Sequence, residues 1–480
     1  MDYSGKKVVV MGLGLHGGGL ETARFLLKRG ASLTITDIRD EKTLLPSIER
    51  LDASCRELKG ESVRYVLGKH EMEDFKNADI VIKNPGVKPD SPFLLASKNI
   101  ETDISLFLSE SKARLFAVTG SKGKSCTATA LHRILDRAGN YGKAYLGGNI
   151  TVSPLTFLDE LSENDDVVLE LSSWQLGDLK GRVSDDGNPL LKPKAAILTA
   201  IMPDHLDRYA SMEEYVDDKR NIYRGQDESC VTVAGDDEWG KSFLSESKGR
   251  PLVYSGSADC FALAVNQSGG WIDSDGRGMA LLRGWPLCDN KITELVPAIL
   301  RTPGNHQKLN LLAASLAAYS LGMEAEKIRG VLAEFPGIEH RLELFHEAKG
   351  IRFYNDSAAT IPEAAAACVE ALSLQGSLVL VTGGTDKNLN FTPLARTAVK
   401  AKEVILLAGT GSEKLIPLLG EEGINYRGPF DNLDKAVLCA LEKAKEGGII
   451  ALSPGCASFG MFLNEFDRGR QWKETVLKLT

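Results

Sequence analysis

The chain has 480 residues, of which 43% are hydrophobic, and its formal net charge is −8. This length is too great for one hydrophobic core and predicts about three domains. The mild negative charge and the lack of a Lys/Arg run argue against nucleic acid as the main partner. The apolar run after the N-terminal lysines is too short for a signal peptide, and no later segment approaches a membrane span. We therefore expect a cytoplasmic protein without membrane insertion.

The first segment has the pattern of a βαβ unit. A strand at Lys7–Met11 leads into the turn "GLGLHGGG" and a helical pattern, and a second strand, "SLTITD", ends at Asp37. Gly12, Gly14 and Gly17 have G-x-G-x-x-G spacing, which with Asp37 is typical of a dinucleotide-binding domain. The same glycines also serve close helix–strand packing or any phosphorylated ligand. An NAD-dependent oxidoreductase is therefore one hypothesis among others.

A glycine-rich turn near residue 120 predicts phosphate binding. In "LFAVTGSKGKS" an apolar run precedes the turn, and a helical pattern follows it. Backbone N–H groups at a helix start attract anions, a lysine there reaches the outer phosphates, and a following serine ligates Mg²⁺. The general P-loop has four residues between its glycines, and here there are two, so a bare turn is the alternative. The predicted phosphate-binding residues are Gly120, Ser121, Lys122, Gly123, Lys124 and Ser125.

Two apolar runs in the middle segment indicate buried parallel strands. Val167–Leu171 and Ala195–Ala200 lack the alternation of half-exposed strands. Ligands bind beyond the carboxyl ends of such strands. Glu170 lies within the first run and His205 follows the second, so with Ser125 they form a candidate metal set. Taken singly, a strand-end glutamate is often a helix cap or ion-pair partner, and a lone histidine is usually structural.

A third α/β segment begins at about residue 340. The strands "IRFYND", "SLVLVTGG", "EVILLAG" and "GIIALSPG" alternate with helical patterns such as "IPEAAAACVEAL". Polar clusters, "NDSAAT", "GGTDKN" and "SPGCAS", follow three of these strands. Such residues are also common in ordinary turns. Their placement nevertheless suggests a second substrate edge.

These features together resemble one known family. The motifs "TGSKGKS", "GGN", "ELSSWQL", "DHLDRY", "YVDDKRNIY", "GNHQKLN", "HRLE", "NDSAAT", "GGTDKN" and "SPGCASF" occur in the order seen in the Mur ligases. The resemblance spans nearly the whole chain and includes the short phosphate turn. It implies a three-domain α/β fold: a Rossmann-like domain for the UDP part of the substrate (1–103), a central P-loop ATPase-type domain (104–338) and a Rossmann-like C-terminal domain for the amino acid (339–480).

The resemblance also implies an activity. It indicates a monomeric ligase that uses ATP to form an amide bond through an acyl phosphate, in cytoplasmic peptidoglycan precursor synthesis. The implied substrates are UDP-N-acetylmuramoyl-L-alanine and glutamate, and we expect the D-isomer. Alternatives are an L-glutamate-adding branch of the same superfamily, a folylpolyglutamate-synthase-like enzyme, which has no use for the first 100 residues, and a non-catalytic nucleotide-binding switch.

Site residues follow from the resemblance position by position. Lys124 would contact the outer phosphates, Ser125 and Glu170 would hold one Mg²⁺, and His205 a second. Lys219 matches a lysine that the family carbamylates, although by itself it reads as a solvated helix residue. The ATP base and ribose would meet Gln307, Asn310, Arg341 and Asp356. The UDP-sugar substrate would meet Leu15, His16, Asp37, Arg39, Gly86, Asn149, Ser172 and Gln175. Glutamate would meet Thr360, Lys387 and Ser458.

Four positions differ from the family pattern. Gln307 stands where Asn is usual. At the acceptor edge, Ala358 replaces a common Lys, Thr385 replaces Asp, and Glu465 replaces an aromatic residue. The third domain is therefore expected to hold glutamate in its own way.

Overall fold

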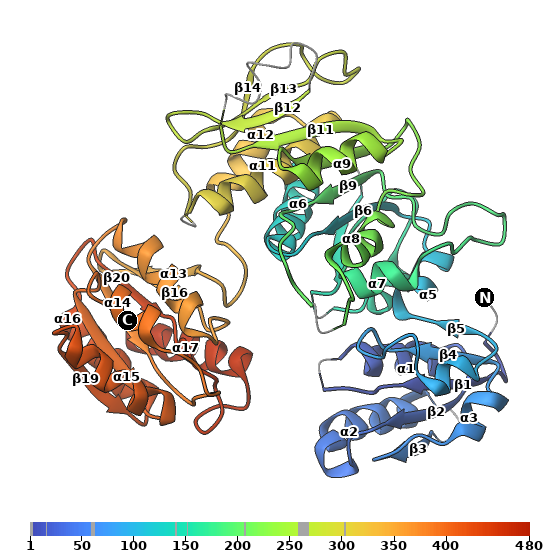
Figure 1. Ribbon diagram of the computed structural model, residues 1–480, viewed down its shortest axis with the longest axis horizontal. Helices are drawn as coiled ribbons and strands as arrows, with labels where there is room; N and C mark the ends of the chain where they lie inside the picture. Colours follow the sequence, from blue (N-terminus) through green and yellow to red (C-terminus); the bar gives the residue numbers. More distant parts are fainter. Residues whose placement is uncertain are drawn as a thin grey trace. The chain divides into compact units, whose positions relative to one another are not determined.

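The computed structural model describes residues 3–15, 17–58, 63–139, 142–150, 152–205, 208–257, 268–301 and 304–480. The chain forms two compact units (Figure 1). The first comprises Met1–Ala298 and Lys308–Leu332, and the second comprises Ile299–Gln307 and Ala333–Thr480. The first unit contains a five-stranded and a nine-stranded sheet, and the second a six-stranded sheet. The predicted three-domain α/β fold is confirmed, while the boundaries at 103/104 and 338/339 stay predictions.

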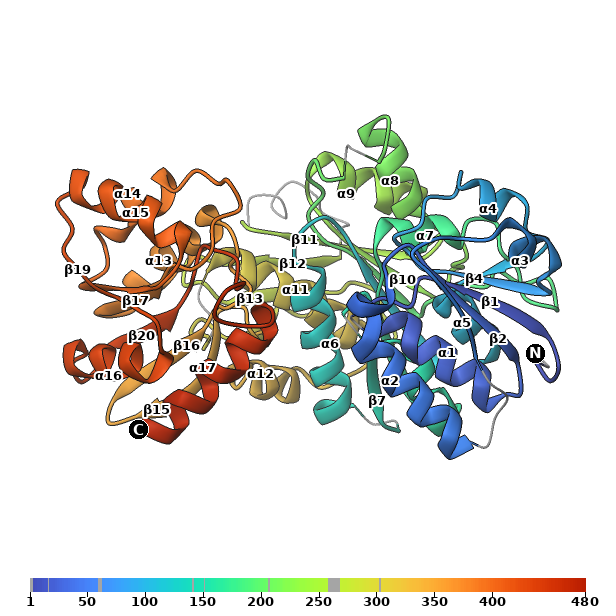
Figure 2. The same cartoon turned by 90° about the horizontal axis from the view of Figure 1, so that it is seen from below.

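The N-terminal sheet is parallel and covered on both faces. Its strands, in spatial order, are β3 (Arg64–Leu67), β2 (Ser32–Asp37), β1 (Lys7–Met11), β4 (Ile80–Lys83) and β5 (Ile100–Glu101). Its helices are α1 (Gly18–Lys28), α2 (Glu41–Leu58), α3 (Met72–Asn77) and α4 (Pro92–Leu95), and α5 (Asp103–Glu110) follows it. Val8 and Val10 share a core with α1 and α2, whereas Val9 and Met11 pack with Phe75 of α3. Figures 1 and 2 show these two helix layers on opposite faces.

The central sheet has a long parallel part and a short antiparallel part. In spatial order its strands are β14 (Thr293–Val296), β13 (Gly278–Leu281), β12 (Gly269–Ile272), β11 (Arg250–Ser255), β10 (Val231–Gly235), β9 (Ala195–Leu198), β6 (Arg114–Thr119), β8 (Asp166–Glu170) and β7 (Ala144–Gly148). Only the β12–β13 and β13–β14 pairs among them are antiparallel. Every residue of β8 and β9 is buried, which confirms the predicted parallel core strands. The helices are α6 (Lys124–Ala138), α7 (Ser173–Asp178), α8 (Met212–Arg220), α9 (Glu238–Glu246), α11 (Asn305–Ser320) and α12 (Ala325–Ala333).

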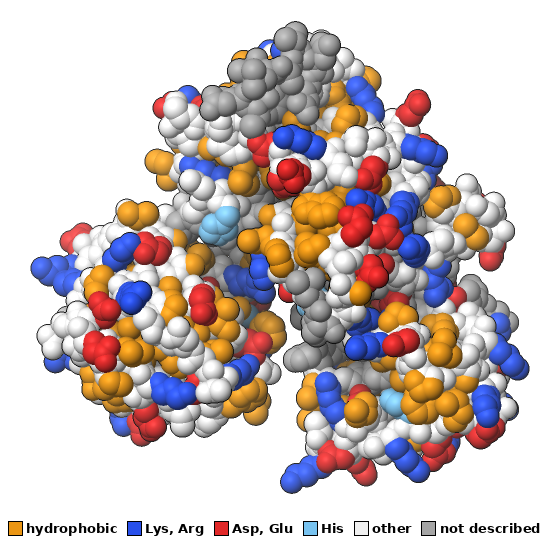
Figure 3. All heavy atoms as spheres, in the orientation of Figure 1, with side chains coloured by type: hydrophobic (Ala, Val, Ile, Leu, Met, Phe, Trp, Pro, Cys, Tyr) orange, Lys and Arg blue, Asp and Glu red, His pale blue; other side chains and the backbone are white. Residues whose placement is uncertain are grey.

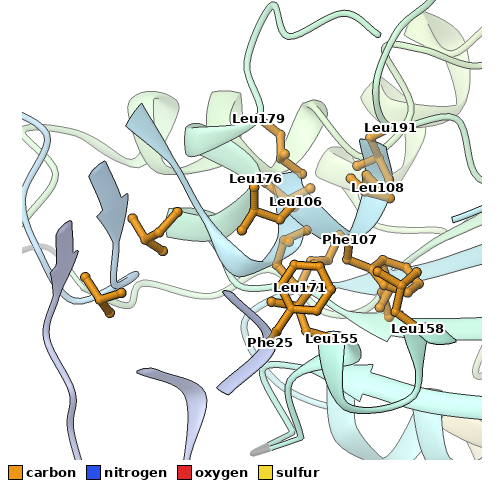
Figure 4. Packing of buried hydrophobic residues seen from close by; sticks show 14 of the residues in the cluster. Phe25, Leu106, Phe107, Leu108, Leu155, Leu158, Leu171, Leu176, Leu179 and Leu191 are labelled. Atoms are coloured by element: carbon orange, nitrogen blue, oxygen red, sulfur yellow. The ribbon is translucent and has the colours of Figure 1, made fainter. Parts of the chain in front are cut away.

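The two sheets of the first unit share one hydrophobic core. Phe25 of α1, Phe107 of α5 and Leu155 belong to the same buried cluster as Leu171 and Leu176 of the central part. Figure 4 shows these side chains converging between the ribbons. Since buried apolar area is the main source of stability, this continuous cluster explains why the two sheets form one unit.

The second unit is a doubly wound sheet. Its strands, in spatial order, are β15 (Glu343–Ala348), β16 (Ile351–Asn355), β20 (Ile449–Leu452), β17 (Leu378–Thr382), β18 (Glu403–Leu407) and β19 (Tyr426–Phe430), and only β15 pairs antiparallel. Helices α13 (Pro362–Ser373), α14 (Thr392–Ala398) and α15 (Thr410–Glu421) cover one face, and α16 (Leu433–Lys443) and α17 (Glu465–Leu479) the other (Figure 2). Along β17, Leu378 and Leu380 face the first layer, and Val379 and Val381 face the second.

The surface carries charges of both signs. On the face shown in Figure 3, basic and acidic side chains are interspersed over both units. Within the described part of the chain, none of the helices combines the length and apolar character needed to cross a bilayer.

Candidate active site

The phosphate turn lies between the end of β6 and the start of α6, as predicted. Gly120 and Gly123 have φ angles of +144° and +92°, in the region that favours glycine. A Cβ on Gly120 would lie 1.9 Å from Oγ1 of Thr199, and one on Gly123 would lie 2.3 Å from Oδ1 of Asn310. Both glycines are therefore required by close approach as well as by backbone conformation.

Neighbouring loops hold this turn in place. The backbone N–H of Ser121 donates to the carbonyl of Ala200 at 2.8 Å, and its Oγ donates to the carbonyl of Met202 at 2.9 Å. The same hydroxyl lies 2.8 Å from the hydroxyl of Tyr215. Nζ of Lys124 donates to the carbonyls of Gly120 and Ser121, each at 3.1 Å. The lysine charge thus lies directly on the turn, where phosphate charge would need to be neutralised.

Three predicted metal ligands lie at one sheet edge. Ser125 is in the first turn of α6, which follows β6, while Glu170 ends β8 and His205 follows β9. Because β8, β6 and β9 are neighbours and parallel, their carboxyl ends share that edge. The His205 side chain is 44% exposed, and its ring centroid lies 4.9 Å from that of Trp174.

Glu170 has a buried carboxylate oxygen that is free to bind a cation. Its side chain is buried, and Oε1 accepts a hydrogen bond from Nδ2 of Asn149 at 3.1 Å. Oε2 is buried and has no hydrogen-bond partner among the described residues. A buried unsatisfied oxygen costs about 1–3 kcal/mol, and a bound divalent cation would remove that cost. The residues present therefore fit a magnesium site.

Lys219 is buried, although its sequence context reads as solvated. It is 1% exposed, donates from Nζ to the carbonyl of Gly120 at 2.8 Å, and lies 4.5 Å over the ring of Tyr215. Burial, followed by repulsion from Lys124, lowers the pKa of Lys219 to about 7. A substantial fraction of this amine is therefore neutral, and hence nucleophilic, at neutral pH.

A cavity of about 370 Å³ opens beside this edge, within the first unit. Five residues predicted to contact the UDP-sugar substrate line it: Leu15, Arg39, Gly86, Asn149 and Gln175. The cavity therefore brings together predicted residues of the N-terminal and central sheets, and its size suits a small-molecule ligand.

Among the described residues, the others predicted to contact the UDP-sugar substrate are not among those that line the cavity. Asp37 does not line the cavity: its carboxylate accepts the backbone N–H groups of Gly14 at 3.2 Å and Arg39 at 3.0 Å. Ser172 is the N-cap of α7 and forms a reciprocal capping box with Gln175. His16 lies outside the described residues.

The cavity has further polar residues that sequence reasoning missed. Lys83 and Asp103 both line it. Nζ of Lys83 lies 2.5 Å from Oδ2 of Asp178, and burial lowers the pKa of Lys83 and raises that of Asp178. Burial also raises the pKa of Asp103 to about 6. The sequence did contain a signal for Lys83, because it ends the apolar run "DIVIK", and a charged side chain in a buried strand needs a partner.

Arg208 is another residue that the sequence did not single out. Its guanidinium donates to the carbonyls of Pro85, Gly86 and Val87 at 3.4, 3.5 and 3.3 Å. It also lies 4.2 Å over the ring of Trp174, which lines the cavity and contacts His205. Arg208 therefore connects the loop after β4 with Trp174, which contacts His205.

The predicted amino-acid residues lie at one edge of the second unit. Thr360, Ser458 and Lys387 follow β16, β20 and β17, which are neighbouring strands. Ser458 is buried, while Nζ of Lys387 lies 5.5 Å over the ring of Phe459. The Thr385 hydroxyl donates to the carbonyl of Phe459. The three polar clusters thus meet at the carboxyl ends of the strands, as the sequence indicated.

The four predicted ATP base and ribose residues are spread over the two units. Gln307 and Asn310 lie on α11, and Arg341 lies in the turn before β15. Asp356 is buried, accepts the Ser453 hydroxyl at 2.6 Å, and has its pKa raised to about 6 by burial. The roles of these four residues toward one nucleotide stay predictions.

A group of potential metal ligands also lies in the second unit. It consists of Glu339, His340 and Glu343. Nζ of Lys473 lies 3.2 Å from the Glu339 carboxylate and 2.7 Å from that of Glu343. This ammonium already compensates both carboxylates, so we assign the group a structural role.

Comparison with known proteins gives matches along the whole chain. The Mur ligase MurD-like N-terminal domain matches residues 6–105, the Mur ligase middle domain 118–318, and the Mur ligase glutamate ligase domain 340–456. The chain is similar to UDP-N-acetylmuramoylalanine--D-glutamate ligase of Treponema pallidum, with 38% identity over 98% of this chain and 97% of the relative. Identity to the enzyme of that name from Roseiflexus sp. is 37% over the full length of both chains.

A solved structure supports the architecture. The fold is similar to that of UDP-N-acetylmuramate-alanine ligase from Thermotoga maritima, with a TM-score of 0.57 and 18% identity, covering 99% of this chain and 100% of the other. At this identity the likeness concerns the fold alone.

Proposed function

Because this chain belongs to the Mur ligase family, we propose that it joins D-glutamate to UDP-N-acetylmuramoyl-L-alanine at the expense of ATP. The chain is an ATP-dependent amide-bond-forming ligase of peptidoglycan precursor synthesis, and an oxidoreductase is not favoured. The names of the relatives from Treponema pallidum and Roseiflexus sp. support D-glutamate over L-glutamate. We further propose that the enzyme is a cytoplasmic monomer with domains 1–103, 104–338 and 339–480.

The observation that carries this proposal is the edge formed by β8, β6 and β9. It combines the phosphate turn, the Lys124 ammonium, the unpartnered oxygen of Glu170 and the buried Lys219 beside a ligand-sized cavity. This arrangement suits activation of a carboxylate by ATP, because such a reaction needs charge neutralisation and positioning more than a protein nucleophile.

In the first step, the substrate carboxylate attacks the γ-phosphorus of ATP. The bond to the β,γ-bridging oxygen breaks, and ADP and an acyl phosphate form. The N–H groups of the turn and Lys124 bind phosphate oxygens and stabilise the developing charge. Asn149 and Gln175 line the cavity and orient the muramoyl-alanine end, while Leu15, Arg39 and Gly86 line the part assigned to UDP.

Two Mg²⁺ ions would be held by Ser125 with Glu170 and by His205 with carbamylated Lys219, and would neutralise phosphate and carboxylate charge. The neutral amine of Lys219 would add to the carbon of CO₂, so that an N–C bond forms while one C=O π bond opens. Loss of an N–H proton to solvent then leaves an anionic carbamate. This chemistry suits an amine whose pKa lies near 7.

In the second step, the glutamate amine attacks the acyl carbon. The C–O bond to phosphate breaks, inorganic phosphate leaves, and the nitrogen loses a proton to give the amide. Lys387 would pair with a glutamate carboxylate, and Thr360 and Ser458 would donate hydrogen bonds. Gln307, Asn310, Arg341 and Asp356 would hold the ATP base and ribose.

Phosphate release tests this function. The enzyme is incubated with ATP, Mg²⁺ and UDP-N-acetylmuramoyl-L-alanine, and D-glutamate, L-glutamate or neither is added. We expect release that depends on D-glutamate. Dependence on L-glutamate would keep the mechanism but reject the acceptor, and ATP turnover indifferent to both isomers would favour a nucleotide-binding switch.

A further inference from the structure

Arg468 of α17 is a buried cation at the acceptor edge of the second unit. It is 1% exposed. Its Nε donates to Oγ of Ser357 at 3.0 Å, its Nη2 to the carbonyl of Ser357 at 2.8 Å, and its Nη1 to the carbonyl of Cys456 at 3.1 Å. All three acceptors are neutral. Within the described residues, Arg468 forms no ion pair with a carboxylate.

The contacts of Arg468 join the loops that carry the acceptor residues. Ser357 belongs to the loop after β16, which continues to Thr360, and Cys456 to the loop after β20, which continues to Ser458. A Cβ on Gly384, in the loop after β17, would lie 3.8 Å from Nη1. The guanidinium therefore bonds to two of the three loops that carry the polar clusters and lies next to the third.

The charge of Arg468 is only weakly compensated. Burial lowers the pKa of Arg468 to about 10, so it remains protonated at neutral pH, and attraction from Cys456, Glu465 and Asp356 opposes this shift. Removing an ion from water is costly unless it is paired, and carbonyls supply only partial negative charge. A bound anion at the loop surface would complete this compensation, because charges interact strongly through a region of low dielectric constant.

We propose that Arg468 is a positioning and specificity-determining residue for the acceptor amino acid. It holds the loops after β16, β17 and β20 in one arrangement, and its positive charge favours an acceptor with two carboxylates over one with a neutral side chain. This inference rests on the proposed function, since that function supplies glutamate as the acceptor. Arg468 does not touch the substrate and acts through the loops and through its electric field.

The test compares three substitutions by steady-state kinetics, with D-glutamate and D-glutamine as alternative acceptors. In Arg468→Lys, the charge remains but a single ammonium cannot reach three acceptors. We expect KM for D-glutamate to rise roughly tenfold, with KM for UDP-N-acetylmuramoyl-L-alanine within about twofold of wild type. In Arg468→Met, we also expect the preference for D-glutamate over D-glutamine to fall by roughly tenfold.

Ser357→Ala provides a milder variant if Arg468→Met does not fold. It keeps the charge and removes one acceptor, so KM for D-glutamate should rise by roughly threefold while the acceptor preference is retained. Arg352→Lys is the matched control. Arg352 is the second residue of β16, at the end of the strand away from Ser357, and donates to the carbonyl of Gln375 at 2.8 Å. The Arg352→Lys substitution should leave KM for D-glutamate and KM for D-glutamine unchanged.

Two results would overturn the proposal. One is an Arg468→Lys or Ser357→Ala enzyme with wild-type KM for D-glutamate. The other is an equal rise in KM for all substrates, which would indicate a general structural role. The wild-type enzyme is measured first: lack of dependence on glutamate there would reject the proposed function, whereas a wild-type response with unaffected variants would reject only the role of Arg468.

Discussion

The phosphate turn of the first unit and the acceptor edge of the second differ in how their functional groups are held. At the turn, Ser121 and Lys219 are buried and each bonds to a fixed carbonyl. At the acceptor edge, Lys387 is exposed, and the buried groups are Ser458 and the loop anchors, Ser357 and Arg468. Under the proposed function, phosphoryl transfer would therefore take place on a preorganised site, while acceptor recognition would use an exposed cation supported by buried groups.

The largest effect is expected at Lys124. In Lys124→Ala, the turn loses the ammonium that bonds to Gly120 and Ser121, so roughly 10³-fold of kcat should be lost for ATP-dependent amide formation. Lys194→Ala is the control, because this lysine is exposed and precedes β9. A comparable loss in the control, or activity within a few-fold of wild type in Lys124→Ala, would contradict the role.

Gly120→Ala tests the rigidity of the turn. The added Cβ would meet Oγ1 of Thr199 at 1.9 Å, and the φ of +144° suits only glycine. We expect a loss of about 1–3 kcal/mol in the free energy of unfolding, measured by denaturant titration, and a large loss of activity. Gly330→Ala in α12 meets open space and should gain about 0.5–1 kcal/mol. Equal free energies of unfolding for the two variants would contradict the close contact between Gly120 and Thr199.

The activity should depend on pH and CO₂ through Lys219. Its lowered pKa means that the neutral fraction, and with it carbamate formation, increases as pH rises through about 7. We expect a several-fold rise in kcat across this interval and a several-fold loss after removal of CO₂ and bicarbonate. ¹³C-labelled bicarbonate should give a carbamate NMR signal that Lys219→Met lacks. A carbamate signal that persists in Lys219→Met would show that the ¹³C label is bound to another residue.

Arg208→Ala should give a small effect that is confined to one substrate. It removes the contacts to the loop at Pro85–Val87 and to Trp174, so KM for UDP-N-acetylmuramoyl-L-alanine should rise roughly fivefold with KM for ATP unchanged. Arg182→Ala is the control, because Arg182 also connects the N-terminal and central parts, through Glu101, away from this loop. An equal rise in KM for Arg208→Ala and Arg182→Ala would indicate a general loss of contact between the N-terminal and central parts, and not a specific role of Arg208 in positioning the loop.

The backbone of the parallel sheets was predictable from the sequence. Apolar runs such as Lys7–Met11 and Val167–Leu171 indicate buried strands because both of their faces need apolar cover. The antiparallel strands β12–β14 were not predicted. They have four residues each, and β12 and β13 begin with glycine, which leaves too few side chains to establish a period.

The site residues were predictable where a motif or the family resemblance indicated them. Gly120, Lys124 and Glu170 lie where the sequence placed them, whereas Lys219 was singled out only by the resemblance, and its polar neighbours indicated a solvated position instead of the burial observed. Arg468 in "FDRGRQW" reads as a surface residue. Its burial depends on loops that lie 12 and 111 positions away in the chain, which local patterns do not reveal.

We propose that the phosphate turn and Lys124, which act on the transferred phosphoryl group, belong to the first unit, and that the residues that recognise the acceptor belong to the second. The most direct test of this division is trapping of the acyl phosphate with hydroxylamine in the absence of glutamate, comparing wild type, Lys124→Ala and Lys387→Ala. We predict that Lys387→Ala still forms the hydroxamate from UDP-N-acetylmuramoyl-L-alanine but loses D-glutamate-dependent ligation, while Lys124→Ala loses both. Loss of hydroxamate formation in a folded Lys387→Ala enzyme would contradict this division of roles.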